Sequence, residues 1–206
     1  KVVISCLNSK YIHASLAPWC LLAGVKAFAK NDYDIKVLES TINGNPHDFA
    51  QKIISENPQV VSFSCYIWNI TGTLEICKEI KENLNCKIIL GGPEVAYRPQ
   101  DVLEKYDFID FVLSGEGEWN FPLLLDNING DFKCVDGLTY RKNNEIIANP
   151  EKEYTETPPS PYSEDFYKNL NGRIAYIETS RGCPYRCAFC LSGRCSKLRF
   201  FDIEQV

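Results

Sequence analysis

The sequence predicts an α/β fold in which a five-stranded parallel sheet is covered by helices on both faces. Short apolar runs alternate five times with segments of helical periodicity over about 130 residues. Strict alternation of this kind is typical of parallel strands joined by helical crossovers. The first run is continuously apolar, which suits a strand that is buried on both faces. Apolar residues make up 45% of the chain, which is ordinary for a globular protein with a core.

Each predicted element has its own signal in the sequence. The strands are expected at residues 2–7, 35–38, 60–65, 88–90 and 108–113. The first helix follows from apolar spacing between Leu16 and Ala27, and the second begins at Pro46, a favoured first-turn residue. Apolar spacing places three further helices near residues 77–84, 102–106 and 118–128. Five such units suit a flavodoxin-like doubly wound fold whose sheet ends near Gly130.

After Gly130 the pattern changes. Residues 137–141 and 145–148 flank a polar turn and predict a β-hairpin. A Pro-Pro-Ser-Pro stretch at residues 158–161 predicts a stiff linker, and residues 174–177 predict another strand. We therefore divide the chain into a first domain of residues 1–130, a hairpin and linker of residues 131–171, and a last segment of residues 172–206.

Composition narrows the functional classes. The chain has 206 residues and a net charge of −5, so a nucleic-acid partner is not indicated. No signal peptide and no apolar run of membrane-spanning length is visible, and a cytoplasmic location is expected. Five of the ten cysteines fall within apolar strand or helix patterns and are expected to be buried in a reducing cytosol. These are Cys6, Cys20, Cys65, Cys77 and Cys86.

A cysteine cluster near the end of the sequence carries the strongest chemical signal. Its spacing is C-x-x-x-C-x-x-C. Three thiolates on one short loop can each bind one iron of a four-iron four-sulfur cluster. A cluster held by three cysteines keeps one iron open, and an open metal position can bind a substrate. The predicted metal ligands are Cys183, Cys187 and Cys190.

The segment from Thr179 to Cys190 resembles the signature of the radical S-adenosylmethionine (radical SAM) superfamily. The resemblance implies that the open iron chelates S-adenosyl-L-methionine and that the reduced cluster splits it into a 5′-deoxyadenosyl radical. Phe189 matches the aromatic residue before the last cysteine and is expected to be a cofactor-binding residue. The resemblance also implies that residues 174–177 are the first strand of a (β/α) barrel. It further implies an electron donor such as a flavodoxin or ferredoxin.

Two alternatives explain the same cysteines differently. One is a structural zinc site in which Cys195 is the fourth ligand, but zinc sites usually use well-separated pairs of cysteines. The other is a chance group of free cysteines. The preceding strand, the Arg-Gly lead-in and Phe189 argue against chance. Cys195 is expected to be an ordinary cysteine.

The loops at the carboxyl ends of the strands are the expected binding edge of the first domain, as in other open parallel sheets. Glycine-rich turns follow the fourth and fifth strands, where they let a bulky ligand approach the backbone. With the Ala-Pro start of the first helix, these turns resemble the cobalamin-binding domain that precedes the barrel in one class of radical SAM enzymes. The resemblance implies that a corrinoid site is lined by Ser64, Gly91, Gly92, Pro93, Gly115, Glu116 and Gly117.

The sequence departs from the D-x-H-x-x-G motif whose histidine ligates cobalt in many cobalamin proteins. His13 lies in the first loop without the matching Asp or Gly, and we interpret it as structural. Cobalamin is therefore expected to bind without a protein ligand to cobalt. The alternative is a doubly wound domain that has kept its shape and lost its cofactor.

We expect a fragment of a cobalamin-dependent radical SAM enzyme that transfers a methyl group or performs another radical reaction. One alternative is a radical SAM enzyme whose first domain binds no corrinoid. Another is a non-enzymatic sensing module with a zinc knuckle. The substrate is not predicted by this sequence. The fragment alone is expected to be inactive, and the segment after Gly172 is expected to lean on the first domain, pair with another chain or be poorly ordered, because its strand lacks partners.

Overall fold

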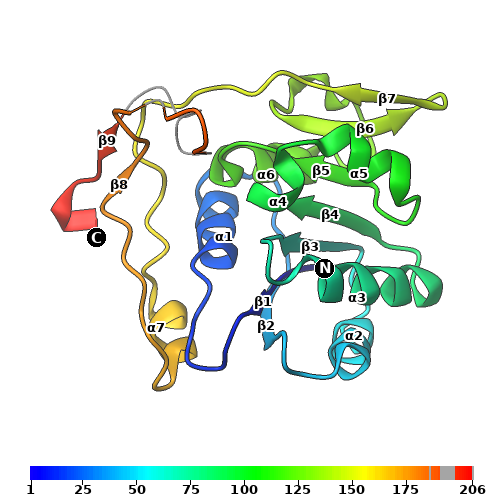
Figure 1. The fold of residues 1–206 in the computed structure, drawn as a ribbon, viewed down its shortest axis with the longest axis horizontal. Helices are drawn as coiled ribbons and strands as arrows, with labels where there is room; N and C mark the ends of the chain where they lie inside the picture. The colour runs from blue at the N-terminus through cyan, green and yellow to red at the C-terminus, as the bar shows by residue number, and fades with distance from the viewer. Residues whose placement is uncertain (186, 191–197, 206) are drawn as a thin grey trace.

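A seven-stranded sheet forms the centre of the structure, a computed structural model that describes residues 1–185, 187–190 and 198–205 (Figure 1). The strand order is β2-β1-β3-β4-β5-β6-β7, and the first five strands are parallel. The order 2-1-3-4-5 is that of a flavodoxin-like sheet, so the predicted fold is confirmed. The parallel strands are β1 (Val2–Asn8), β2 (Ile35–Thr41), β3 (Val60–Ser64), β4 (Lys87–Gly91) and β5 (Phe111–Leu113).

Helices cover both faces of the sheet. Helices α1 and α6 pack on one face, and α2, α3, α4 and α5 pack on the other. Along β4, Ile88 and Leu90 belong to one core and Ile89 to the other. This two-sided burial is the reason for the apolar runs in the sequence. The helices are α1 (Ala17–Phe28), α2 (Pro46–Ser55), α3 (Ile70–Asn83), α4 (Pro93–Ala96), α5 (Pro99–Lys105) and α6 (Gly117–Asp126).

The sheet does not end near Gly130, and this part of the prediction is wrong. The predicted hairpin, β6 (Leu138–Lys142) and β7 (Glu145–Ala148), extends the sheet antiparallel to β5. Without it, β5 would present an unpaired edge. Leu138 and Tyr140 are buried in the same core as α6, which gives the hairpin an apolar reason to join the sheet.

The linker contains a helix that the sequence analysis missed, α7 (Glu164–Leu170). Its first turn is capped by the Ser163 hydroxyl, which accepts a hydrogen bond from the backbone N–H of Phe166 at 3.3 Å. Phe166 is buried, and its ring meets that of Trp19 edge-on. The signal was present, because Ser followed by Glu-Asp is typical of a helix start.

The predicted strand at residues 174–177 is not formed. In the described chain, Ile174 makes one isolated bridge to the loop after β1, with its N–H donating to the carbonyl of Ile12 at 2.8 Å. A strand is stable only when a neighbour pairs along its length, and this segment has a single point of pairing. Strand β8 (Ser180–Arg181) instead pairs antiparallel with β9 (Arg199–Phe200). Of the three alternatives expected for the segment after Gly172, its described residues fit the first, because Arg173, Ile174 and Arg181 contact the first domain.

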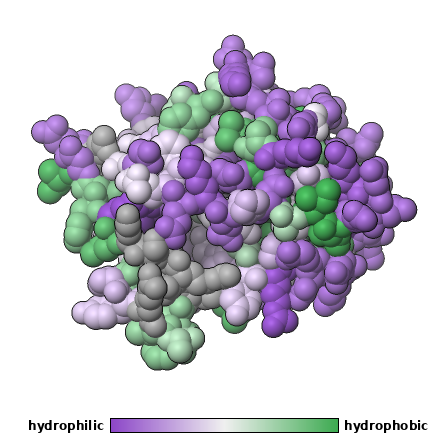
Figure 2. All heavy atoms as spheres, turned by 90° about the horizontal axis from the view of Figure 1, so that it is seen from above, coloured by the Kyte–Doolittle hydropathy of each residue, from purple (hydrophilic) through white to green (hydrophobic). Residues whose placement is uncertain are grey.

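The surface seen in Figure 2 is mainly hydrophilic, and its apolar residues form separate patches. This is ordinary for a folded protein surface. Among the helices of the described chain, none combines the length and the apolar character needed to cross a membrane.

Candidate functional site

A cavity of about 820 Å³ opens where β3, β4 and β5 end. Its wall is completed by the start of α1, by the turn before α6, by residues 151–155, and by Glu178, Arg181 and Gly182. The volume lies within the range of typical small-molecule sites, roughly 300–1,000 Å³. The carboxyl ends of parallel strands meet at one edge, and ligands bind there in folds of this kind.

The cavity brings together six of the seven residues predicted for the corrinoid site. Pro93 is the exception, because it starts α4 and is absent from the cavity wall. The agreement follows from topology, since turns far apart in the sequence must meet where neighbouring parallel strands end. The six are Ser64, Gly91, Gly92, Gly115, Glu116 and Gly117.

Ser62 is a cavity residue that the sequence analysis missed. It is buried, lines the cavity, and its Oγ has no hydrogen-bond partner within the described chain. A buried hydroxyl without a partner costs free energy, so a ligand that bonds to it would recover that cost. Ser62 stands two residues before Ser64, and this alternation along a strand could have identified it.

Small side chains create the space. Val60 and Ile89 belong to the core that α1 and α6 cover. Further along the same strands, Ser62, Ser64 and Gly91 take these positions. Residues two apart in a strand share a face of the sheet. On the face that α1 covers, the sheet therefore presents the hydroxyls of Ser62 and Ser64 and the backbone of Gly91 to the cavity. The result is a pocket in which apolar side chains such as Phe63, Ile89 and Leu113 surround the serine hydroxyls, while charged side chains gather in the wall near Arg181 and Arg199.

Gly92 has a structural role that differs from the predicted one. Its φ is +95°, and an added Cβ would lie 2.5 Å from the carbonyl oxygen of Cys65. The glycine is therefore required where the loop after β3 crosses the end of β4, whether or not a ligand is bound. Gly115 also has a positive φ of +80°, but a Cβ there would meet nothing closer than Glu151 Oε2 at 3.7 Å.

We predict that Gly92→Ala destabilises the domain by at least about 2 kcal/mol, because the side chain adds left-handed strain to a backbone collision. Urea unfolding measures the change. Gly130→Ala is the control, since a Cβ there lies 3.6 Å from the nearest atom. Equal stability of Gly92→Ala and wild type would contradict this account.

An arginine–glutamate cluster closes one side of the cavity. Arg181 contacts Glu178 at 2.8 Å, Glu116 at 3.0 Å, and also Glu118. Arg199 contacts the second oxygen of Glu116. Burial by itself would lower the pKa of Arg181, but its hydrogen bonds and charge interactions with Glu178 and Glu118 raise the pKa above the usual value. Arg181 is therefore a permanent cation in this wall.

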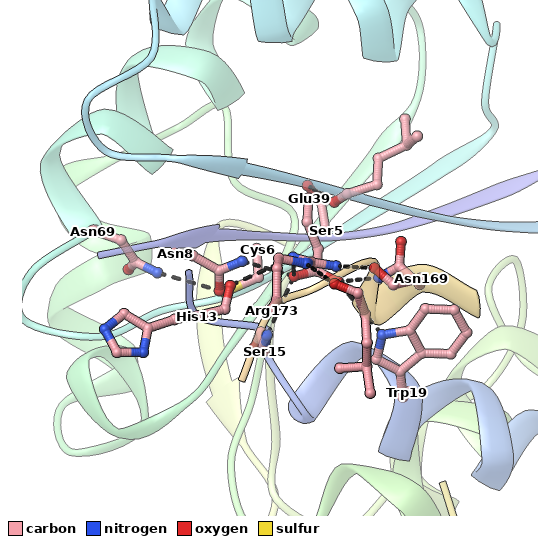
Figure 3. Close-up of polar contacts among 12 residues, drawn as sticks. Ser5, Cys6, Asn8, His13, Ser15, Trp19, Glu39, Asn69, Asn169 and Arg173 are labelled. Carbon is pink, nitrogen blue, oxygen red and sulfur yellow. Dashed lines mark hydrogen bonds and ion pairs between the residues drawn. The ribbon is translucent and has the colours of Figure 1, made fainter. Parts of the chain in front are cut away.

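A second polar cluster fastens α7 and the following residues to the first domain (Figure 3). Its centre is Glu39 of β2, whose side chain is only 6% exposed. Glu39 accepts hydrogen bonds from Arg173 at 3.0 Å and from Asn169 at 2.8 Å. A buried carboxylate needs such partners, so this contact fixes the segment that leads to the cysteine motif.

His13 lies apart from the cavity. Its Nδ1 is 2.5 Å from the hydroxyl of Tyr176, and neither His13 nor His47 lines the cavity wall. Both histidines of the chain are described, so the cavity offers no imidazole to a metal. This placement agrees with the interpretation of His13 as a structural residue.

The cysteine motif lies beside the cavity wall. Gly182 lines the cavity and Cys183 is partly buried, whereas Cys187 and Cys190 are exposed. Phe189 is 93% exposed and does not reach the cavity. In residues 1–185, 187–190 and 198–205, no three His, Cys, Asp or Glu side chains are arranged to hold a metal ion. Cys195, the fourth ligand of the alternative zinc site, lies outside the described residues.

The other predicted cysteines behave as core residues. All five of those expected within strands or helices are buried and form no disulfide. Burial raises the pKa of the Cys6 thiol to about 12, so this thiol is inert at neutral pH. Among the described cysteines, the reactive thiols are therefore expected to be the exposed or partly exposed ones.

Comparison with known proteins identifies the cavity domain. The B12 binding domain family matches residues 4–125. The cobalamin-dependent radical SAM methyltransferase TokK of Streptomyces tokunonensis is 32% identical over 72% of this chain and 24% of its own length. A 2-(S-pantetheinyl)-carbapenam-3-carboxylate methyltransferase of Streptantibioticus cattleyicolor is 33% identical over 73% of this chain and 24% of its own length.

Solved structures agree on the fold. The cobalamin-dependent S-adenosylmethionine radical enzyme OxsB superposes with a TM-score of 0.73 at 20% identity, over 98% of this chain and 30% of OxsB. TsrM of Kitasatospora setae, with cobalamin and a [4Fe-4S] cluster bound, gives 0.70 at 17% identity, over 99% of this chain and 44% of TsrM. The chain spans about a quarter of the length of the two curated relatives above. The chain belongs to the B12-binding domain family, and one of its relatives, TokK, is a cobalamin-dependent radical SAM methyltransferase.

Proposed function

We propose that this chain binds cobalamin in the cavity at the carboxyl edge of its sheet and serves a radical SAM enzyme that transfers methyl groups. The main observation that supports this proposal is the cavity, which is lined by the predicted turns and lies in a domain of the B12-binding family. Methyl transfer is the reaction named for TokK and for the carbapenam methyltransferase. Bound cobalamin would supply a cobalt-centred carrier for such a group.

The residues of this chain would bind and orient the cofactor. Ser62 would donate a hydrogen bond from the cavity floor, and Gly91 would leave room beside it. Arg181 and Arg199 would close the wall nearest the cysteine motif. No histidine lines the cavity, so we infer that cobalt takes no imidazole ligand from this domain.

The second cofactor site in this proposal is the cysteine motif. Cys183, Cys187 and Cys190 would supply three thiolates to a four-iron cluster, and S-adenosyl-L-methionine would bind the open iron. A reducing cytosol and an electron donor of the flavodoxin or ferredoxin type complete the proposal. The corrinoid-free alternative and the zinc alternative differ from it in metal content, since they require no cobalt and no iron respectively.

We predict that Ser62→Ala weakens hydroxocobalamin binding roughly three- to tenfold, because one hydrogen bond to the ligand is lost. A spectrophotometric titration of the chain with hydroxocobalamin measures the dissociation constant. Thr73→Val is the matched control, since Thr73 Oγ1 is also buried without a partner in the described chain but lies outside the cavity wall.

Two outcomes would count against these claims separately. If the wild-type chain shows no saturable spectral change, the cobalamin proposal fails. If wild type binds and Ser62→Ala binds equally well, Ser62 is not a cofactor contact, although the site stands.

A further inference from the structure

The two segments on either side of the cysteine motif converge on one carboxylate. Arg181 ends β8 before the motif, and Arg199 begins β9 after it. These two residues are register partners in the antiparallel pair, and Figure 1 shows β8 beside β9. Glu116 Oε2 accepts from Arg181 at 3.0 Å, and Glu116 Oε1 accepts from Arg199. One side chain of the first domain thus holds both ends of the motif.

These ion pairs are largely withdrawn from solvent. The side chain of Arg181 is 18% exposed and that of Arg199 is 13% exposed. Exposed pairs contribute little, but removing one partner of a shielded pair leaves an uncompensated charge and costs more. Arg181 keeps Glu118 and Glu178 if Glu116 is lost. For Arg199, the remaining contact in the described chain is the backbone carbonyl of Glu156 at 2.7 Å.

The same residues form the wall of the cavity. Glu116, Arg181 and Arg199 all line it, and so does Gly182, the residue before Cys183. The Glu116 carboxylate is already used by two arginines, so its oxygens are directed to protein groups rather than left open for a ligand. This differs from the role that the sequence suggested for Glu116, a contact to the corrinoid.

We propose that Glu116 is a positioning residue that holds the cysteine motif against the cofactor cavity. By fixing Arg181 and Arg199 together, it sets where Cys183 stands relative to the cavity wall. The functional part of this inference rests on the proposed function, because it places the cluster ligands next to the cobalamin site. Its structural content is independent of any cofactor.

The test is the alkylation rate of individual thiols in the 206-residue chain, measured by mass spectrometry after timed treatment with iodoacetamide. Cys183 is partly buried, and the exposed Cys187 and Cys190 serve as references in the same molecule. Glu116→Gln should raise the alkylation rate of Cys183 relative to these references by at least about fivefold, because local opening around Cys183 is then opposed by at least one fewer charged hydrogen bond.

Glu56→Gln is the matched control. Glu56 also bridges two cations, Lys1 at 3.0 Å and Lys36 at 2.5 Å, and its side chain is 18% exposed. It lies outside the cavity wall. Its replacement should leave unchanged the alkylation rate of Cys183 relative to Cys187 and Cys190, which we call the Cys183 ratio. If Glu116→Gln also makes core thiols such as Cys65 reactive, that variant is unfolded. Arg199→Gln is then tested in its place, again by the alkylation rate of Cys183 relative to Cys187 and Cys190.

A hydroxocobalamin titration of the same variants separates this inference from the proposed function. An unchanged Cys183 ratio in folded Glu116→Gln overturns the positioning role. If that variant also loses cobalamin binding, Glu116 is a ligand contact instead. A raised Cys183 ratio in a chain whose wild type binds no cobalamin would support the positioning role and refute the proposed cofactor.

Discussion

Replacing Cys187 with alanine is expected to abolish the iron–sulfur cluster that we propose for the cysteine motif. After anaerobic reconstitution of the protein with iron and sulfide, wild type should hold four irons, and Cys187→Ala should hold no four-iron cluster. The reason is that three thiolates leave no spare ligand, so the loss of one leaves two irons open. Iron and sulfide content and the visible absorption of the cluster measure the outcome.

Cys134→Ala is the control for this experiment. Cys134 is exposed in the structure, as Cys187 is, but it lies 49 residues before the motif begins. It should retain the full cluster. A Cys187→Ala protein with four irons and the wild-type spectrum would show that the ligand assignment is wrong, and zinc without iron in wild type would favour the zinc knuckle.

Gly91→Leu is expected to weaken cobalamin binding by about 100-fold or more, because a large side chain would fill the cavity between the sheet and α1. Gly91 shares a face of β4 with Ile89, and both line the cavity. An added Cβ would lie 3.3 Å from the carbonyl oxygen of Leu113, a tight contact that a small shift relieves. Titration with hydroxocobalamin measures the affinity, and urea unfolding checks the fold.

Gly72→Leu is the matched control, because it makes the same change at a glycine outside the cavity wall. A Cβ at Gly72 also meets its nearest atom at 3.3 Å, in this case Leu7 Cδ1, and Gly72 is absent from the cavity wall. Its affinity should equal that of wild type. Tight binding by a folded Gly91→Leu variant would place the cofactor elsewhere. Gly92 is unsuited to this test, because its substitution disturbs the backbone at Cys65.

The sequence predicted the parallel sheet well because the signal is local. An apolar run such as Val60 to Cys65 records burial on both faces without reference to its neighbours. The same holds for the cavity turns, since topology requires the ends of β4 and β5 to lie together. Helix α7 also has a local signal, because its capping residue Ser163 is followed by two acidic residues in the first turn.

The errors fall where a segment depends on a distant partner. The hairpin of β6 and β7 was recognised, but its attachment to β5 depends on a sheet edge more than 20 residues away. Residues 174–177 have the composition of a strand, yet the described chain supplies only the loop near His13 to pair with them. Strand pairing is decided by the available neighbour, and composition does not encode which neighbour that is.

The sequence by itself determined the succession of the five parallel strands, the cysteine spacing and the edge of the sheet where a ligand would bind. Only the tertiary structure decided which side chains at that edge remain open to a ligand. Glu116 is occupied by arginines 65 and 83 residues away, whereas Ser62 is buried without a partner in the described chain. Periodicity and motif spacing arise within a few residues, but the pairing of charges and hydroxyls depends on contacts that exist only after the chain has folded.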